Sequence, residues 1–180
     1  MALIEGTSGN DTRFGTNGND TIRGFGGNDF LNGLGGSDQI FGGSGNDVLF
    51  GFGASDVLNG GSGNDDLEGG LGFDVLTGGT GADRFVFRNG FDGSTDIITD
   101  FVVADDTLVF EDFGVGNGTL NVDAFRIGSV AADSSDRFIY NSSTGDLFFD
   151  ADGIGGIGQV HVATLSANLA MTNNDISLIA

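Results

Sequence analysis

The chain contains no cysteine and no proline. Without cysteine, no disulfide framework can hold the fold together, although this absence does not exclude an extracellular protein. Something other than disulfides must therefore stabilise the folded chain. No apolar run approaches the ~20 residues of a membrane span. The first residues, MALIEGTSG, lack both the basic and the apolar region of a cleaved signal peptide.

Basic residues are scarce. Only 6 of the 180 residues are Lys or Arg, against 26 Asp and Glu, which gives a formal charge of −20. A negative surplus of this size is repelled by nucleic acids and by anionic membranes, so both are poor partners. The same surplus attracts cations.

Glycine, by contrast, is abundant, with 35 residues. From Gly6 the chain divides into nine blocks of nine residues: GTSGNDTRF, GTNGNDTIR, GFGGNDFLN, GLGGSDQIF, GGSGNDVLF, GFGASDVLN, GGSGNDDLE, GGLGFDVLT and GGTGADRFV. The first position is always glycine. The sixth is always aspartate, at Asp11, Asp20, Asp29, Asp38, Asp47, Asp56, Asp65, Asp74 and Asp83. The fourth is glycine except at Ala54, namely Gly9, Gly18, Gly27, Gly36, Gly45, Gly63, Gly72 and Gly81.

The eighth position of each block is large and apolar, with Arg13 as the exception. A flexible, acidic glycine-rich linker has no reason to keep an apolar residue there. Positions seven to nine therefore read as a short strand with position eight inside, and the first six positions read as a turn. Two blocks would close one coil of a flattened solenoid, whose stacked strands form two parallel sheets. Each layer adds only two core side chains, so we expect that burial alone does not stabilise the stack.

The turns offer a set of hard oxygen ligands. Glycines allow positive φ angles and close backbone approach, so that a turn can direct carbonyl oxygens inward. The sixth-position aspartate adds a carboxylate beside them. Carbonyl and carboxylate oxygens without His or Cys are the ligands that calcium prefers.

This pattern, GGxGxDxUx, resembles the calcium-binding nonapeptide repeat of RTX (repeats-in-toxin, haemolysin-type) proteins over residues 6–86. The resemblance implies an all-β, right-handed parallel β-roll. Each Ca²⁺ would lie between same-side turns of adjacent coils, bound by sixth-position carboxylates and turn carbonyls, including those of the fourth-position glycines. The odd edge would carry Asp11, Asp29, Asp47, Asp65 and Asp83, and the even edge Asp20, Asp38, Asp56 and Asp74. Four gaps on one edge and three on the other predict about seven sites.

The period ends after Phe87, and residues 88–180 read as β structure contiguous with the roll. DRFIYNSSTGDLFFDADG predicts a hairpin with the return strand Leu147–Phe149, QVHVATLS a strand, and TNNDISLIA a capped turn before a last strand. We therefore predict two parts: a calcium-binding roll at 1–87 and a C-terminal β cap at 88–180.

The C-terminal half is also similar to the corresponding regions of RTX proteins secreted by type I machinery. The similarity rests on a D-x-I-x-D-F element at residues 96–101 and on an acidic residue followed by apolar ones at 175–179. It implies an uncleaved export signal at the C-terminus, with the type I secretion machinery as a partner.

Other motifs match only in part. GIGGIG at 153–158 fits a dinucleotide fingerprint but precedes a predicted strand rather than a helix. Asp150 and Asp152 open an EF-hand-like loop whose twelfth residue is His161, where a Glu is required. His161 stands in a predicted strand without a zincin motif, so we expect no catalytic site. Whether Asp96, Asp100, Asp150 and Asp152 bind calcium is left open by the sequence.

The sequence thus predicts a secreted, non-enzymatic calcium-binding module that folds outside the cell on binding about seven Ca²⁺. Two alternatives stay open: the C-terminal module of a larger secreted enzyme such as a protease, lipase or epimerase, and an RTX adhesin. A surface-binding row of Thr in the turns does not continue beyond Thr16. The even edge carries four apolar turn residues, so we predict that the C-terminal region or a protein partner covers it: Leu34, Phe52, Leu71 and Phe73.

Overall fold

The computed structural model describes residues 1–88, 92–111, 118–119, 121–151 and 158–179. In this part of the chain the regular structure is β, apart from two short 3₁₀ turns, η1 (Val122–Ala124) and η2 (Asn173–Asp175). Among the described residues there is no helix whose length and hydropathy would let it cross a lipid bilayer.

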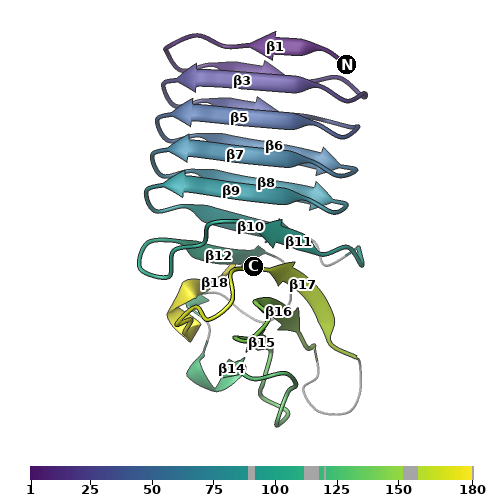
Figure 1. Cartoon of the computed structure of the whole chain (residues 1–180), viewed down its shortest axis with the longest axis vertical. Coiled ribbons are helices and arrows are strands. Elements are labelled where there is room, and N and C mark those ends of the chain that lie inside the picture. Colours follow the sequence, from purple (N-terminus) through teal and green to yellow (C-terminus); the bar gives the residue numbers. More distant parts are fainter. Residues whose placement is uncertain (89–91, 112–117, 120, 152–157, 180) are drawn as a thin grey trace.

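The strands form two sheets that face each other across a narrow core (Figure 1). The first sheet has ten strands, in the spatial order β1 (Leu3–Glu5), β3 (Thr21–Gly26), β5 (Gln39–Ser44), β7 (Val57–Ser62), β9 (Val75–Thr80), β11 (Asp96–Ile98), β17 (Val160–Thr164), β16 (Asp146–Phe149), β15 (Phe138–Asn141) and β14 (Phe125–Ile127). The second has eight, in the order β13 (Gly118–Thr119), β18 (Ile176–Ile179), β12 (Thr107–Glu111), β10 (Arg84–Arg88), β8 (Asp66–Leu71), β6 (Val48–Gly53), β4 (Phe30–Asn32) and β2 (Thr12–Phe14).

Successive blocks of the repeat alternate between the two sheets. Within the repeat region of each sheet, neighbouring strands are parallel and equivalent residues pair at a spacing of two blocks, as Ile22 does with Ile40 and Leu31 with Leu49. Two blocks therefore make one coil, and the prediction of an all-β parallel solenoid is confirmed.

The strands are longer than the sequence predicted. We expected three strand residues and six turn residues in each block, but β5 to β9 each contain six residues. Pairing resumes beyond the first-position glycine, for example between Phe25 and Gly43. The backbone ladder thus continues into the glycine-rich segment, and the turn proper is confined to positions four to six.

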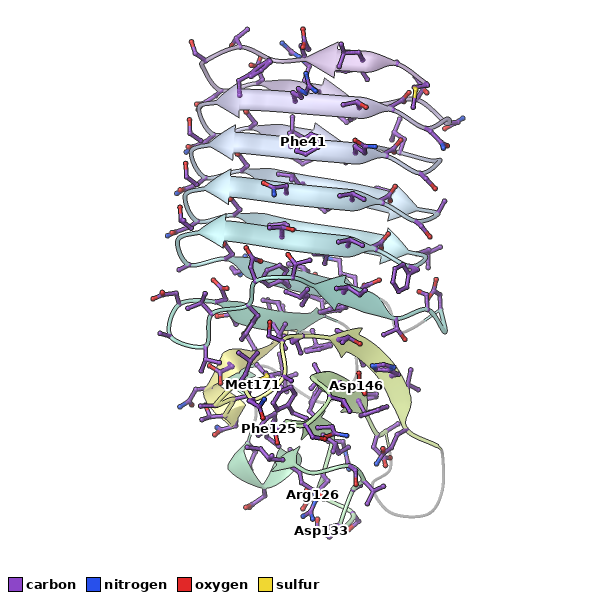
Figure 2. The ribbon with its side chains drawn as sticks, in the orientation of Figure 1. Phe41, Phe125, Arg126, Asp133, Asp146 and Met171 are labelled. Atoms are coloured by element: carbon purple, nitrogen blue, oxygen red, sulfur yellow. The ribbon has the colours of Figure 1, made fainter. Side chains whose placement is uncertain are left out.

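The eighth position fills the core. Leu49, Leu58, Leu67 and Leu76 are fully buried, whereas Phe41, at the ninth position of its block, lies on the outer face of β5 (Figure 2). The out–in–out alternation predicted for positions seven to nine is confirmed by the burial of β7, in which Leu58 is buried between two less buried neighbours.

The N-terminal end of the stack begins earlier than the first recognised block. Ile4 in β1 pairs with Ile22 and packs against the core, so residues 3–5 supply a further half-coil. Arg13 does not enter the core. Its guanidinium forms an ion pair with Asp11 at 2.7 Å and donates to the carbonyl of Glu5 at 3.0 Å.

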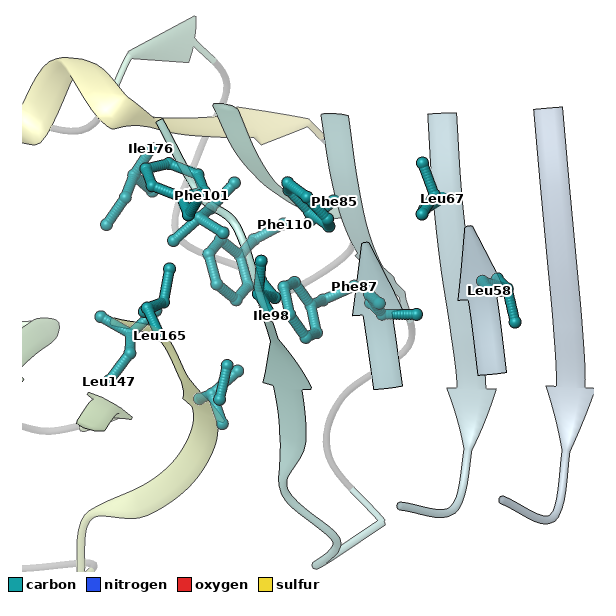
Figure 3. Close-up of a cluster of buried hydrophobic side chains, with 14 of the residues drawn as sticks. Leu58, Leu67, Phe85, Phe87, Ile98, Phe101, Phe110, Leu147, Leu165 and Ile176 are labelled. Carbon is teal, nitrogen blue, oxygen red and sulfur yellow. The ribbon is translucent and has the colours of Figure 1, made fainter. Parts of the chain in front are cut away.

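The same ladder passes residue 87 without a break. β11 pairs in parallel with β9, and β12 with β10. Phe85 and Phe101 lie 6.0 Å apart between ring centroids, and the core then continues through Phe110, Leu147 and Ile176 (Figure 3). The roll and the C-terminal region therefore share one core.

The predicted elements of the C-terminal region are present. β15 and β16 form the antiparallel hairpin, β17 is the predicted strand, and η2 precedes the last strand, β18. Thr172 and Asp175 form a reciprocal capping box on η2. The GIGGIG segment lies outside the described residues except for Gly158.

Of the two coverings predicted for the even edge, packing of the C-terminal region is wrong, and a protein partner stays a prediction. Phe52 remains 57% exposed and Phe73 46% exposed. The C-terminal strands extend the stack along its axis instead, because their apolar residues complete the open end of the core (Figure 1).

Candidate metal centres

The nine repeat aspartates form two hydrogen-bonded ladders, one along each edge. The backbone N–H of each aspartate donates to Oδ1 of the aspartate in the next coil, over 2.7–3.0 Å. These bonds bring together the carboxylates that the sequence placed on each edge, and they fix the orientation of every side chain.

The second carboxylate oxygen, Oδ2, has no hydrogen-bond partner in seven of these aspartates. All seven side chains belong to residues that are at most 2% exposed: Asp29, Asp38, Asp47, Asp56, Asp65, Asp74 and Asp83. A buried carboxylate oxygen without a partner is costly, since it has lost water and gained nothing in exchange. Each such oxygen is therefore a candidate ligand for a cation.

Carbonyl oxygens converge on the same places. A methyl group added at the first-position Gly42 would lie under 3.0 Å both from Oδ2 of Asp47, in the same turn, and from the carbonyl oxygen of Gly60, in the next coil. Gly24 has the same relation to Asp29 and to the carbonyl oxygen of Gly42. Glycine is required at the first position because any side chain would fill this cradle.

The donor set fits calcium. It consists of carboxylate and carbonyl oxygens, which hard cations prefer, and calcium accepts irregular arrangements of six to eight such ligands. No group of three or more His, Cys, Asp or Glu side chains is placed to hold a metal ion among the described residues. Backbone carbonyls must therefore complete each centre around the paired carboxylates.

Burial controls the charge of these carboxyls. It raises the pKa of Asp56 and of Asp65 to about 7 and that of Asp74 to about 6, and neighbouring carboxylates add to the effect. It also raises the pKa of Asp38, Asp47 and Asp83. Without a cation, the folded stack holds several carboxyls that resist ionisation near neutral pH; a bound divalent ion would remove that penalty.

The fourth-position residues adopt left-handed backbone in the third to ninth blocks. Their φ angles are +96° to +130° at Gly27, Gly36, Gly45, Gly63, Gly72 and Gly81, and +75° at Ala54. Gly9 and Gly18 do not share this conformation. The glycines predicted as ligands therefore fall into two structural groups.

The structure also extends both ladders beyond the repeats. Asp74 donates its N–H to Asp96 and Asp83 to Asp106, each at 3.0 Å. The register was hidden in the sequence because the spacings grow from 18 residues to 22 and 23. A detectable signal was the apolar residue two positions after each aspartate: Ile98 and Leu108 are both buried.

The D-x-I-x-D-F element has a structural role at every marked position. Asp96 continues the even ladder and Ile98 continues the core. Asp100 accepts hydrogen bonds from the N–H groups of Gly78 and Gly79, at 2.9 and 2.8 Å, and Phe101 is buried.

The odd edge has a second ladder that we did not predict. The side-chain oxygens of Asn10, Asn28 and Asn46 each accept from the backbone N–H eighteen residues later, at 2.8–2.9 Å, and Asn64 does the same at 3.0 Å. The recurring fifth-position Asn was its signal. These amides stiffen the odd-edge turns next to the aspartates.

The remaining sequence candidates lie away from these centres. His161 in β17 contacts Oδ1 of Asp146 at 3.2 Å and stacks on Phe148. Asp150 is buried, and Asp152 lies outside the described residues.

The fold and its edges define a calcium-binding parallel β-solenoid. Residues 5–40, 32–67 and 59–93 match the model of the RTX calcium-binding nonapeptide repeat, which contains four copies of the repeat. Residues 5–93 are therefore RTX calcium-binding nonapeptide repeats, and these repeats bind Ca²⁺. The repeats are a calcium-binding module rather than a catalytic one.

Two solved structures resemble the chain in outline. The AlgE6R3 subunit of the Azotobacter vinelandii mannuronan C5-epimerase is 22% identical, with a TM-score of 0.39, and the match covers 94% of this chain and 79% of that one. The extracellular lipase LipA of Serratia marcescens is 19% identical, with a TM-score of 0.35, over 98% of this chain and 40% of the lipase. No curated protein matches the chain.

Proposed function

We propose that this chain is a secreted, non-enzymatic module whose folding is driven by the binding of about seven Ca²⁺ ions outside the cell. The observation that carries the proposal is the set of seven buried Oδ2 atoms without a partner. The residues that would hold the ions are the sixth-position aspartates and the carbonyls of the turns.

Binding and folding are coupled because the sites exist only in the folded stack. Each centre draws on turns that lie eighteen residues apart, so an unfolded chain cannot assemble it. Without calcium, buried carboxylates face one another along two edges of a chain whose formal charge is −20. The core that opposes this repulsion is only two side chains thick in each layer.

We further propose that residues 88–180 form a C-terminal cap. We also propose that the chain leaves the cell through type I machinery, which would recognise an export signal in the last residues of this cap. The signal-like residues 175–179 largely coincide with β18, which pairs with β12 and buries Ile176. Such a signal is accessible only in an unfolded chain. Low cytosolic calcium would keep it accessible, and higher external calcium would then fold it away.

Circular dichroism with excess chelator tests the coupling. We expect the β spectrum of the full chain to be lost on chelation and restored by added Ca²⁺. Added Mg²⁺ serves as the control and should not restore it, because Mg²⁺ demands a smaller octahedral site and keeps its water. A β spectrum that persists in excess chelator would contradict the proposal.

A further inference from the structure

The turns of the stack exist in two conformations. In the third to ninth blocks, the second and fourth positions both have positive φ, and Oδ2 of the aspartate has no partner. We call these open turns. Three of the second-position residues with this backbone are not glycine. The full set is Phe25, Leu34, Gly43, Phe52, Gly61, Gly70 and Gly79.

The first two turns are closed. Oδ2 of Asp11 accepts from the backbone N–H of Thr7 at 2.5 Å and from its hydroxyl at 2.9 Å. Oδ2 of Asp20 accepts from the N–H and the hydroxyl of Thr16, both at 2.7 Å. No second- or fourth-position residue of these two turns has positive φ. The threonines thus supply the hydrogen bonds that the open turns lack.

The other oxygens of these two carboxylates are occupied as well. Oδ1 of Asp11 is paired with Arg13, and Oδ1 of Asp20 accepts from the N–H of Ala2. Both carboxylates are therefore satisfied by the N-terminal segment itself. Neither carboxylate has an oxygen without a partner, so neither requires a cation in the folded chain.

The C-terminal end of each ladder is different. Oδ2 of Asp74 and of Asp83 is unpartnered, although the nonapeptide pattern supplies no aspartate beyond them. Asp96 and Asp106 stand in the next coil, hydrogen-bonded to the backbones of those two residues. Each thus adds a second carboxylate to a gap that already contains an orphaned oxygen.

The position of the orphaned oxygen tells which gap it serves. Oδ2 of Asp47 lies beside the place that a Cβ on Gly42 would take, and the carbonyl oxygen of Gly60 in the following coil lies beside the same place, whereas Oδ1 accepts from the N–H of Asp29 in the preceding coil. An aspartate with a free Oδ2 therefore opens the gap on its C-terminal side. Applied to every open turn, this rule gives the gaps 29/47, 47/65, 65/83 and 83/106 on the odd edge and 38/56, 56/74 and 74/96 on the even edge.

We propose that the calcium sites are displaced by one coil toward the C-terminus, so that Asp96 and Asp106 contribute to the last sites while the gaps at Asp11 and Asp20 hold no ion. The total stays at seven, in agreement with the number of orphaned oxygens. The threonine-closed turns form a cap that needs no metal. This inference rests on the proposed function, since it assigns that function to particular turns.

Counting bound ions on folded molecules tests the assignment. Native mass spectrometry of the calcium-loaded chain is expected to show about seven ions for the wild type and for Asp11→Asn/Asp20→Asn. Asp96→Asn/Asp106→Asn should lose two ions or bind them at least about ten-fold more weakly, because each affected site keeps a single carboxylate. Asparagine retains one acceptor oxygen, so Asp96→Asn keeps the bond from the N–H of Asp74. Asp20 and Asp106 each accept backbone N–H bonds on both carboxylate oxygens, so each double variant loses one such bond and the two variants are matched in this respect. The displacement is overturned if Asp11→Asn/Asp20→Asn loses ions, or if Asp96→Asn/Asp106→Asn binds all of its ions as tightly as the wild type.

A second variant adds sites instead of removing them. Thr7→Gly/Thr16→Gly converts both closed turns to the GGxGxD pattern and removes the hydroxyls, so two additional ions are expected on the same folded chain. An unchanged count would overturn the role of the threonines. A wild type that binds no calcium would instead contradict the proposed function itself, so the two failures can be told apart.

Discussion

At the residue scale, the second position of each block decides what its aspartate can do. Threonine keeps ordinary backbone and hydrogen-bonds the carboxylate, whereas glycine allows the left-handed turn that leaves Oδ2 free. Phe25, Leu34 and Phe52 occupy the left-handed turn without being glycine. Bulky residues rarely adopt such backbone, so the neighbouring coils must impose it.

The two kinds of turn predict unequal effects of matched substitutions. Asp47→Asn should raise the calcium concentration at the folding midpoint, because Asp47 stands between two gaps in the middle of the odd edge. Asp11→Asn should leave the midpoint nearly unchanged, since its carboxylate is satisfied by Thr7 and Arg13. Calcium titrations followed by circular dichroism measure both, and equal shifts would contradict the assignment.

Backbone strain at Ala54 predicts a stabilising substitution. Its φ of +75° disfavours any residue with a Cβ, so Ala54→Gly should increase the free energy of unfolding in calcium by about 1 kcal/mol. Ala82→Gly is the control, because Ala82 is an exposed turn residue with ordinary φ and should not gain stability. Urea denaturation of both variants in saturating calcium would show the difference, and a loss of stability at position 54 would count against the strain.

At the element scale, each repeat strand from β3 to β10 contributes one fully buried side chain at the eighth position of its block. The strands gain their stability from the coils above and below, because every ladder bond joins residues of neighbouring coils. The aromatic side chains of β10 and β12 then enlarge the core where the roll meets the C-terminal region: Phe87 and Phe110 stack with centroids 5.0 Å apart.

Two adjacent residues of β7 provide a test of this core. Leu58→Ala should cost about 2–5 kcal/mol of unfolding free energy in saturating calcium, because Leu58 is fully buried between its neighbours. Val57→Ala should cost much less, since Val57 points outward and is 41% exposed. Similar losses in the two variants would mean that the eighth position does not carry the core.

At the scale of the whole molecule, charge is the main obstacle to folding. Burial raises the pKa of Asp56, Asp65 and Asp96 from 3.8 to about 7, so the folded metal-free chain binds protons more tightly than the unfolded chain. The resulting destabilisation is fully present above about pH 7 and disappears as the pH falls toward the ordinary value of 3.8.

Protons should therefore replace part of the effect of calcium. We expect the β signal of the metal-free chain to increase as the pH is lowered from about 8 to about 5, as measured by circular dichroism in chelator. Asp56→Asn/Asp65→Asn should respond less to pH, because it lacks two of the groups with raised pKa. A metal-free spectrum that loses β signal on acidification would contradict the role of burial.

The nonapeptide period by itself determined the solenoid, the identity of its core positions and the oxygen ligands. Each of these depends on residues that recur at a fixed spacing. In a parallel stack of equal coils, such residues lie next to one another in neighbouring coils. The tertiary structure alone decided how far the ladders extend. Asp96 and Asp106 join them across longer loops, where no fixed spacing exists, because strand pairing sets the register there.

The tertiary structure also decided which carboxylates are satisfied. Thr7 and Thr16 stand where most other blocks have glycine, and their hydroxyls reach the aspartate only in a turn without positive φ. The sequence pattern does not give the φ angles of the turns. The exposure of Phe52 and Phe73 was likewise beyond the sequence. Whether the C-terminal strands cover an edge or extend the stack depends on which surface of the roll has unpaired strands, and the unpaired strands lie at the end of the stack.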